Sequence, residues 1–277
     1  MYPRIFQKID NFLVKTVDRY ANFRWYANPL TKKILASKEQ YLKIWERAKE
    51  KKYKLIDDFE GKSGFKIDEN WYHKLALHTQ VVVKKSDIVY VHGRLLYASL
   101  RAYLEKNKLE NINIIETGTA RGFSALCMAK ALEDSKICGK IITFDVLPHN
   151  HKMYWNCIDD NNGKKTRREL LKPYHNLTEK YIFFHQGNTK IELPKLQTDR
   201  IHFAFLDSAH DYYYLMSEFQ NIKNKQQKGD IIFFDDYTPK LFPGVVKAID
   251  EICEKYNYLK EIITISEQRA YVIAEKL

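Results

Sequence analysis

The chain has 277 residues, of which 45% are hydrophobic and 29% are charged. These proportions indicate a soluble globular protein with one α/β domain and an added segment, and they exclude a disordered chain. The formal net charge is +11, and residues 1–60 contribute +6 of it through 14 Lys/Arg against 8 Asp/Glu. This bias favours an anionic partner such as nucleic acid, a lipid surface or an acidic glycan; a solvated basic face explains it equally well.

The location of the protein is indicated by what the chain lacks. Apolar runs such as 231–234 are only a few residues long, and the N-terminal segment soon reaches Asp10, so neither a transmembrane helix nor a signal peptide is expected. The four cysteines are scattered without a C-x-x-C pair, which favours reduced thiols over disulfides or a zinc site. We therefore expect a cytoplasmic protein.

Residues 1–79 are predicted to form a helical extension. A break is expected at Asn28-Pro29, and Ser37 and Gln40 form the capping-box pattern that begins a helix. Before that break, apolar residues fall on one face of a helix and cations lie away from it. The apolar residues are Ile5, Ile9, Phe12, Leu13 and Val17, and the cations are Lys8, Lys15 and Arg19. The sequence leaves open whether this segment packs on the main domain, forms a homo-oligomer contact or touches a membrane surface.

Residues 80–277 alternate between strand and helix patterns, which is typical of a parallel sheet with right-handed crossovers. We expect helices at 93–106, 124–133 and 244–256. The predicted strands are 112–116, 140–145, 181–185, 201–207 and 230–235, followed by a hairpin of 259–265 and 269–274. The predicted fold is therefore α/β, a Rossmann-like seven-stranded, mostly parallel sheet with a C-terminal antiparallel hairpin.

The strongest local signal is the turn that follows the first strand. Gly118 permits a tight turn and close approach of a ligand, and Gly122 lets the next helix begin in close packing. The free N–H groups of that helix suit a carboxylate or phosphate. Asp145 ends the second strand, where it can accept hydrogen bonds from ribose hydroxyls. Together these features indicate an adenosyl ligand.

The spacing of this turn is E-x-G-x-x-x-G-x-S, running from Glu116 to Ser124, whereas a dinucleotide site normally reads G-x-G-x-x-G. It resembles the first motif of class I S-adenosylmethionine-dependent methyltransferases. The resemblance implies that Glu116, Gly118 and Ser124 surround the methionine end of the cofactor and that Asp145 holds the ribose. The full set of candidate cofactor residues is Glu116, Thr117, Gly118, Thr119, Gly122, Ser124, Asp145, Asn188 and Asp207. Asn188 is expected to flank the adenine or to form a simple turn.

Acidic residues end two neighbouring strands of the predicted sheet. Asp207 follows one strand, and Asp235 and Asp236 follow the next, so the three carboxylates are expected to converge at one edge. Uncompensated carboxylates repel one another, and a bound Mg²⁺ removes this conflict. The structural alternative is that Asp207 caps a helix and the other two lie in solvent.

The spacing D-x-x-H followed by D-D resembles the metal-dependent sugar O-methyltransferases of macrolide and aminocoumarin biosynthesis, the macrocin and mycinamicin type. The resemblance implies that Asp207, Asp235 and Asp236 hold Mg²⁺, which grips two adjacent hydroxyls of the acceptor, and that His210 is the general base. We expect Asp207 and His210 to be the catalytic residues and a sugar, glycan or other vicinal diol to be the acceptor.

Three other functions compete with this hypothesis. A nucleic-acid methyltransferase fits the positive charge, but residues 207–210 read Asp-Ser-Ala-His where base-methylating enzymes carry (Asp/Asn)-Pro-Pro-aromatic, so at most a ribose target is expected. An NAD(P)-dependent oxidoreductase is disfavoured by the glycine spacing and the clustered acids. A non-catalytic binding protein on a methyltransferase fold is disfavoured because the acids and His210 are all present together.

Overall fold

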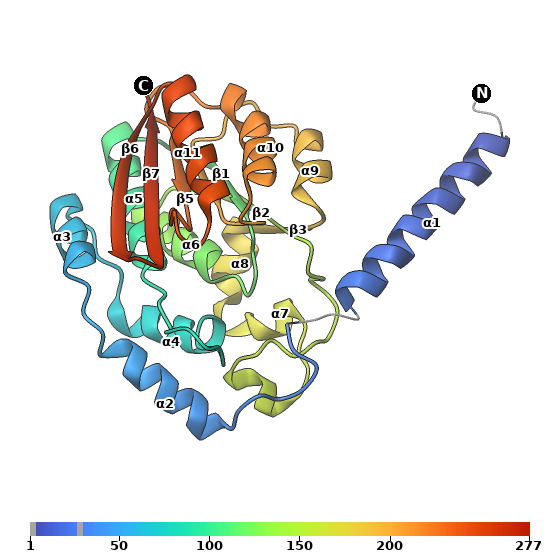
Figure 1. Ribbon diagram of the computed structural model, residues 1–277, viewed down its shortest axis with the longest axis horizontal. Helices are drawn as coiled ribbons and strands as arrows, with labels where there is room; N and C mark the ends of the chain where they lie inside the picture. Colours follow the sequence, from blue (N-terminus) through green and yellow to red (C-terminus); the bar gives the residue numbers. More distant parts are fainter. Residues whose placement is uncertain (1–3, 27–29) are drawn as a thin grey trace.

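The computed structural model describes residues 4–26 and 30–277, and within them seven strands form one mixed sheet (Figure 1). The order of the strands is β3-β2-β1-β4-β5-β7-β6. Strands β1 to β5 run parallel to one another, and β7 runs antiparallel to both of its neighbours, β5 and β6. Their bounds are β1 Asn111–Thr117, β2 Cys138–Asp145, β3 Ile182–Gln186, β4 Phe203–Leu206, β5 Ile231–Phe234, β6 Tyr258–Ser266 and β7 Arg269–Lys276. This sheet confirms the predicted fold class, and each predicted strand overlaps an observed one.

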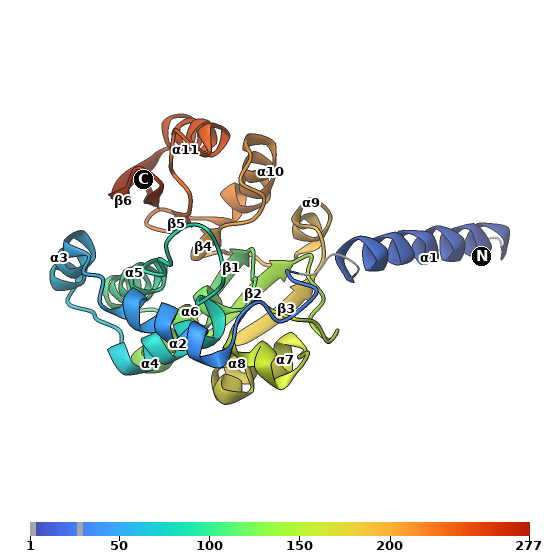
Figure 2. The same cartoon turned by 60° about the horizontal axis from the view of Figure 1, so that its bottom comes forward.

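Each central strand is apolar on both faces because helices cover both faces of the sheet. Phe203 and Phe205 of β4 pack in one core, and Ala204 and Leu206 pack in the other. Figure 2 shows the two layers of helices on opposite sides of the sheet. One layer contains α5 (His92–Asn107), α6 (Phe123–Ser135) and α8 (His175–Tyr181), and the other contains α9 (Thr189–Glu192), α10 (Tyr212–Ile222) and α11 (Pro243–Lys255).

The sequence patterns predicted helices that correspond to α5, α6 and α11, but α10 was missed. This helix begins with three consecutive tyrosines, which favour strands in isolation. The side chain of Asp211 caps it by accepting a hydrogen bond from the backbone N–H of Tyr214 at 2.9 Å, and Leu215 and Phe219 anchor it in the core. Tertiary packing therefore overrides the local preference.

The N-terminal helices other than α1 contribute to the main core. Ser37 and Gln40 form the predicted capping box at the start of α2 (Lys38–Lys49). Ile56 of α3 (Lys54–Ser63) and Leu75 of α4 (Glu69–Thr79) are fully buried in the cluster that also contains the residues of α5 and α6. The break predicted at Asn28-Pro29 lies outside the described residues.

Helix α1 (Arg4–Tyr26) projects away from the domain in both views (Figures 1 and 2). It confirms the helix predicted from the apolar stripe. No helix among the described residues has both the length and the apolar character needed to cross a membrane.

A long insertion between β2 and β3 packs beside the sheet and has a small core of its own. Trp155 is fully buried in it, and the indole Nε1 donates a hydrogen bond to the carbonyl of Lys165 at 2.8 Å. The insertion includes the short helix α7 (Arg167–Leu170) and 3-10 turns at 158–162 and 172–174. The hydroxyl of Tyr41 in α2 reaches it by a hydrogen bond to Asn156 of 3.2 Å, so the N-terminal helices and the insertion support each other.

The strand order reverses between β1 and β4, which is where open α/β sheets bind ligands. The turn after β1 packs directly on the end of β4 at this point. A Cβ atom on Gly118 would lie 1.9 Å from the carbonyl oxygen of Asp207, and Gly118 has a φ of 91°. Only glycine has both the backbone freedom and the small size that this contact requires.

We therefore expect Gly118→Ala to lower the free energy of unfolding by about 3 kcal/mol or more, because it combines overpacking with a left-handed backbone. Urea unfolding measures this loss. Gly61→Ala is the matched control, since Gly61 lies in a helix with nothing within 4 Å of the added methyl group, and it should not destabilise the protein. Equal effects of the two substitutions would contradict the proposed contact.

Candidate functional site

The turn after β1 and the end of β4 are joined by hydrogen bonds as well as by close packing. The backbone N–H of Asp207 donates to the carbonyl of Thr117 at 3.1 Å and lies 3.3 Å from its hydroxyl. Behind them, the buried carboxylate of Glu218 accepts hydrogen bonds from the hydroxyls of Thr117, Ser208 and Thr189. Glu218 thus joins the end of β1, the loop after β4 and the start of α9, and no motif in the sequence singled it out.

Glu116 is fully buried at the end of β1. Its Oε2 accepts a hydrogen bond from the hydroxyl of Thr143, and its Oε1 has no hydrogen-bond partner among the described residues. Burial raises the pKa of Glu116 to about 7, although the nearby hydroxyls of Ser124 and Thr143 oppose the change. A buried acceptor without a donor is costly, and it is a place where a ligand donor is favoured.

The remaining predicted residues of the glycine turn surround Glu116. The buried hydroxyl of Thr119 contacts that of Thr143, and Ser124 lies buried in the first turn of α6. Gly122 precedes α6 with a φ of 88°, and a Cβ there would lie 2.8 Å from the side chain of Leu171. The structure therefore brings these predicted positions together around one buried carboxylate.

Asp145 ends β2 beside this turn but is already well bound by the protein. Its carboxylate accepts hydrogen bonds from the N–H groups of Ala120 at 2.6 Å and Leu147 at 2.8 Å, and Arg167 contacts it at 3.0 Å. The buried guanidinium of Arg167 also donates to the carbonyl of Ala120 at 2.9 Å. Arg167 was not predicted, because the insertion that carries it has no pattern linking it to β2.

Asn188 forms the turn that the sequence analysis gave as its alternative role. Its side-chain oxygen caps α9 by accepting a hydrogen bond from the backbone N–H of Lys190 at 3.0 Å. Its amide donates to the hydroxyl of Tyr214 at 3.2 Å. Both polar ends of this side chain therefore have structural partners.

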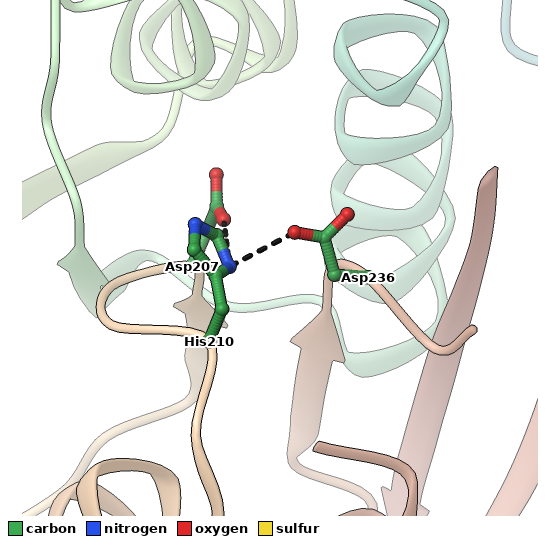
Figure 3. Close-up of side chains that lie close together, drawn as sticks. All are labelled: Asp207, His210 and Asp236. Atoms are coloured by element: carbon green, nitrogen blue, oxygen red, sulfur yellow. Dashed lines mark ion pairs between the residues drawn. The ribbon is translucent and has the colours of Figure 1, made fainter. Parts of the chain in front are cut away.

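Three side chains from the ends of β4 and β5 converge at the same edge (Figure 3). Nδ1 of His210 lies 2.9 Å from Oδ2 of Asp236 and 3.8 Å from Oδ1 of Asp207. One ligand atom from each residue lies within 4.8 Å of the others, which makes this a candidate metal-binding group among the described residues. The convergence of Asp207 and Asp236 matches the expectation from the sequence.

Asp235 lies beside this group but is not part of it. Its Oδ1 accepts a hydrogen bond from the N–H of Asp236 at 2.7 Å. The guanidinium of Arg269, at the start of β7, lies 3.3 Å from Asp235 and 3.1 Å from Asp236. The sequence analysis treated the three carboxylates as uncompensated, and this was wrong because Arg269 neutralises part of their charge.

The electrostatics of the group follow from burial and from the like charges that remain. Burial and the neighbouring Asp235 and Asp236 carboxylates hold the pKa of Asp207 well above its usual range. Burial and Asp236 raise the pKa of Asp235 to about 6. The hydrogen bond to Asp236 raises the pKa of His210 above its ordinary value. The site therefore favours binding of a proton or another cation.

The backbone at this edge is strained. His210 and Asp236 adopt left-handed conformations with φ values of 45° and 58°, and Ala120 in the glycine turn has a φ of 45°. Such conformations are uncommon outside glycine and cluster at functional sites. Here they direct the His210 and Asp236 side chains toward each other.

Comparison with known proteins agrees with this architecture. Residues 115–237, from the end of β1 to just past Asp236, match the family model described as a methyltransferase domain. The solved structure of the O-methyltransferase NovP is similar over 80% of this chain and 96% of that one, with 18% identity and a TM-score of 0.53. The chain has a Rossmann-like methyltransferase fold. Comparison with curated protein sequences gave no match.

Two further structures of this fold were solved with ligands. The O-methyltransferase TomG from Streptomyces achromogenes, in complex with S-adenosylmethionine, covers 84% of this chain and 98% of its own, with 16% identity and a TM-score of 0.53. An O-methyltransferase from Bacillus cereus, in complex with S-adenosylhomocysteine, covers 82% and 93%, with 13% identity and a TM-score of 0.50. At these identities the similarity establishes the fold.

The buried Glu116 makes stability depend on pH. Its pKa is raised from 4.5 to about 7, so the folded state binds more protons than the unfolded state between these values, and stability falls as pH rises through them. We expect the wild-type protein to lose about 3 kcal/mol relative to Glu116→Gln between about pH 5 and about pH 8. Urea unfolding across this range measures the difference.

The matched control is Glu267→Gln, which removes an exposed carboxylate at the hairpin turn and should keep the pH dependence of the wild type. If Glu116→Gln also kept that dependence, Glu116 would be ionised throughout the range and the assignment of the raised pKa to it would be wrong.

Proposed function

We propose that this protein transfers the methyl group of S-adenosylmethionine to a hydroxyl of an acceptor. The observation that carries the proposal is the contact of Gly118 with Asp207, which joins the glycine turn to the acidic group. A methyl donor held at the turn would face an acceptor held at the acids. The methyltransferase fold supports the same assignment.

The turn suits the methionine end of the donor. Oε1 of Glu116 is buried without a partner among the described residues, and an ammonium group is a donor that would satisfy it. Gly118 in the same turn has no side chain, so a ligand can approach its backbone closely. Arg167 and Ala120 bind Oδ2 of Asp145, and Leu147 binds Oδ1, which leaves one acceptor site on Oδ1 for a ribose hydroxyl.

Methyl transfer to a hydroxyl mainly requires alignment of the acceptor oxygen with the methyl group and removal of the hydroxyl proton. The sulfonium methyl group of the donor is already electrophilic, so the protein has to place an acceptor oxygen in line with it. His210 is the proposed proton acceptor. When Nδ1 donates its hydrogen to Asp236, Nε2 carries the free lone pair, and the partly exposed ring leaves it accessible.

The carboxylates of Asp207 and Asp236 are proposed to hold a divalent cation. One oxygen of each carboxylate and one ring nitrogen of His210 lie within 4.8 Å of one another. The two carboxylate oxygens are therefore close enough to share one small cation. Oxygen donors suit Mg²⁺, which would lower the pKa of an acceptor hydroxyl. Asp235 contributes through charge, since Arg269 and the backbone of Asp236 engage its oxygens.

A sugar, a glycan or another vicinal diol is the proposed acceptor class. Two adjacent hydroxyls can share one cation, and the surrounding Asp207, Asp236 and Arg269 offer charged partners for polar groups. Nucleic acid is not favoured by the composition of this edge, which is acidic although the whole chain is basic.

Binding of the donor is tested by thermal unfolding of the wild-type protein. We expect S-adenosylmethionine to raise the midpoint, because a ligand that binds only the folded state stabilises it by about 3 kcal/mol at 100 times its Kd. NAD is the control ligand and should give no shift. No shift with S-adenosylmethionine would remove the basis of the proposal.

The proton acceptor is tested with His210→Ala. We expect methyl transfer to an accepted diol to fall by about 10²-fold or more while stabilisation by S-adenosylmethionine is retained. His175→Ala, at an exposed position on α8, is the matched control and should keep full activity. Near-normal turnover of His210→Ala would exclude the proposed base.

The cation is tested separately, by activity with EDTA and after readdition of Mg²⁺. Loss and recovery of activity, together with inactivity of Asp207→Asn, are expected. Activity unaffected by EDTA would leave Arg269 as the cation that organises the site and would remove Mg²⁺ from the proposal.

A further inference from the structure

Helix α1 carries a large apolar surface that the domain does not cover. Its exposed apolar side chains retain between 47% and 69% of their full accessibility: Ile5 64%, Phe6 50%, Ile9 47%, Phe12 69%, Leu13 54%, Val17 64% and Tyr20 62%. A soluble monomer rarely exposes so many neighbouring apolar side chains without a partner for them. Since α1 projects from the body (Figures 1 and 2), the domain does not supply that partner.

The arrangement of charge around α1 narrows the choice of partner. At about 100° per residue, the seven apolar side chains span an arc of about 140°. Three exposed cations, Lys8, Lys15 and Arg19, lie along one edge of this arc, within about 60° of Phe12. A helix with a wide apolar face bordered by lysine and arginine is suited to an interface between apolar and anionic phases.

We propose that α1 lies in the surface of an anionic lipid membrane and anchors the domain to it. The apolar arc enters the boundary between headgroups and acyl chains, and Lys8, Lys15 and Arg19 contact the lipid phosphates. At about 1.5 Å per residue the 23-residue helix is about 35 Å long, which lets it lie along the surface over six turns. It is long enough to cross a bilayer, but it lacks the apolar character needed to do so.

A second copy of the chain fits α1 less well. A coiled coil buries a narrow seam of residues spaced three and four apart, and the most apolar seam of α1 runs through Phe6, Ile9, Leu13, Thr16 and Tyr20. The polar Thr16 would be buried in the middle of this seam. Ile5, Phe12 and Val17 would lie outside it, whereas a lipid surface covers the whole apolar arc.

The segment that follows α1 also exposes apolar and basic side chains. Leu30, Ile34 and Leu35 are 39% to 44% exposed, and Lys32, Lys33 and Lys38 are exposed among them. This segment is tied to the body through the bridge between Thr31 and Tyr154 and the hydrogen bond from Asn161 to the carbonyl of Ala36. It extends the basic, apolar surface from α1 to the insertion that borders the glycine turn.

The test uses the full-length protein and sedimentation with vesicles. One set contains equal parts of phosphatidylglycerol and phosphatidylcholine, and the other contains phosphatidylcholine alone. We expect the protein to sediment with the anionic set and to remain largely in solution with the neutral set. High salt should weaken the binding, because it screens the basic edge of α1.

Two variants separate the apolar and electrostatic contributions. Phe12→Glu with Leu13→Glu should abolish sedimentation, and Lys8→Gln with Lys15→Gln and Arg19→Gln should weaken it roughly 100-fold, at about 1 kcal/mol per cation. Leu259→Glu with Ile262→Glu is the matched control, since it makes the same change in charge at exposed apolar positions of β6 and should bind as the wild type does. The α1 variants should keep the thermal midpoint of the domain.

Size-exclusion chromatography with light scattering measures the oligomeric state and so tests whether a second copy of the chain covers α1. A dimer that dissociates in Phe12→Glu with Leu13→Glu, together with no vesicle binding by the wild type, would show that a second copy covers α1 and would overturn the proposal. If Leu259→Glu with Ile262→Glu abolished sedimentation equally, the proposal would also be overturned. The loss of vesicle binding would then result from the change in net charge and not from the position of the substitutions in α1.

Discussion

The site depends on one backbone contact, the packing of Gly118 against the carbonyl of Asp207. β1 and β4 are neighbours in space although almost ninety residues separate their ends in sequence. The contact is possible because Gly118 has no side chain and a left-handed backbone. It sets the glycine turn beside the acidic group, so any ligand held by one lies next to the other. The Glu218 carboxylate secures this arrangement through hydroxyls of three segments that are distant in sequence.

Buried charge is the second constraint on this edge of the sheet. Glu116 and Asp207 are acids whose pKa values are raised by burial, so each favours a protonated or cation-bound state. The protein supplies one fixed cation, Arg269, to the pair Asp235 and Asp236. Asp207 lies close to His210 and has no such ion pair with an arginine among the described residues, so it is the carboxylate of this edge that most favours a proton or a cation.

The positive charge of the chain is unevenly distributed between two regions. The edge of the sheet that carries the candidate site is acidic, and the N-terminal segment around α1 is basic and apolar on its surface. In the proposed membrane anchor, the positive charge of α1 would bind anionic lipid and would lie away from the candidate site. The insertion between β2 and β3 lies between the two regions, because Arg121 reaches Trp155 from the turn and Tyr154 pairs with Thr31.

Sequence alone determined the seven strands in chain order, the glycine turn and the acids at the strand ends, because apolar alternation and abrupt polar stops are local patterns. The sequence could also have predicted the position of Arg269. It begins a strand antiparallel to β5, and the start of such a strand must lie at the edge of the sheet where β5 ends. Only the tertiary structure decided which partners these residues have. Arg167 binds Asp145 and Glu218 binds Thr117 across long sequence separations, and α1 leaves its apolar face uncovered, because such contacts depend on how distant segments pack and no local pattern records them.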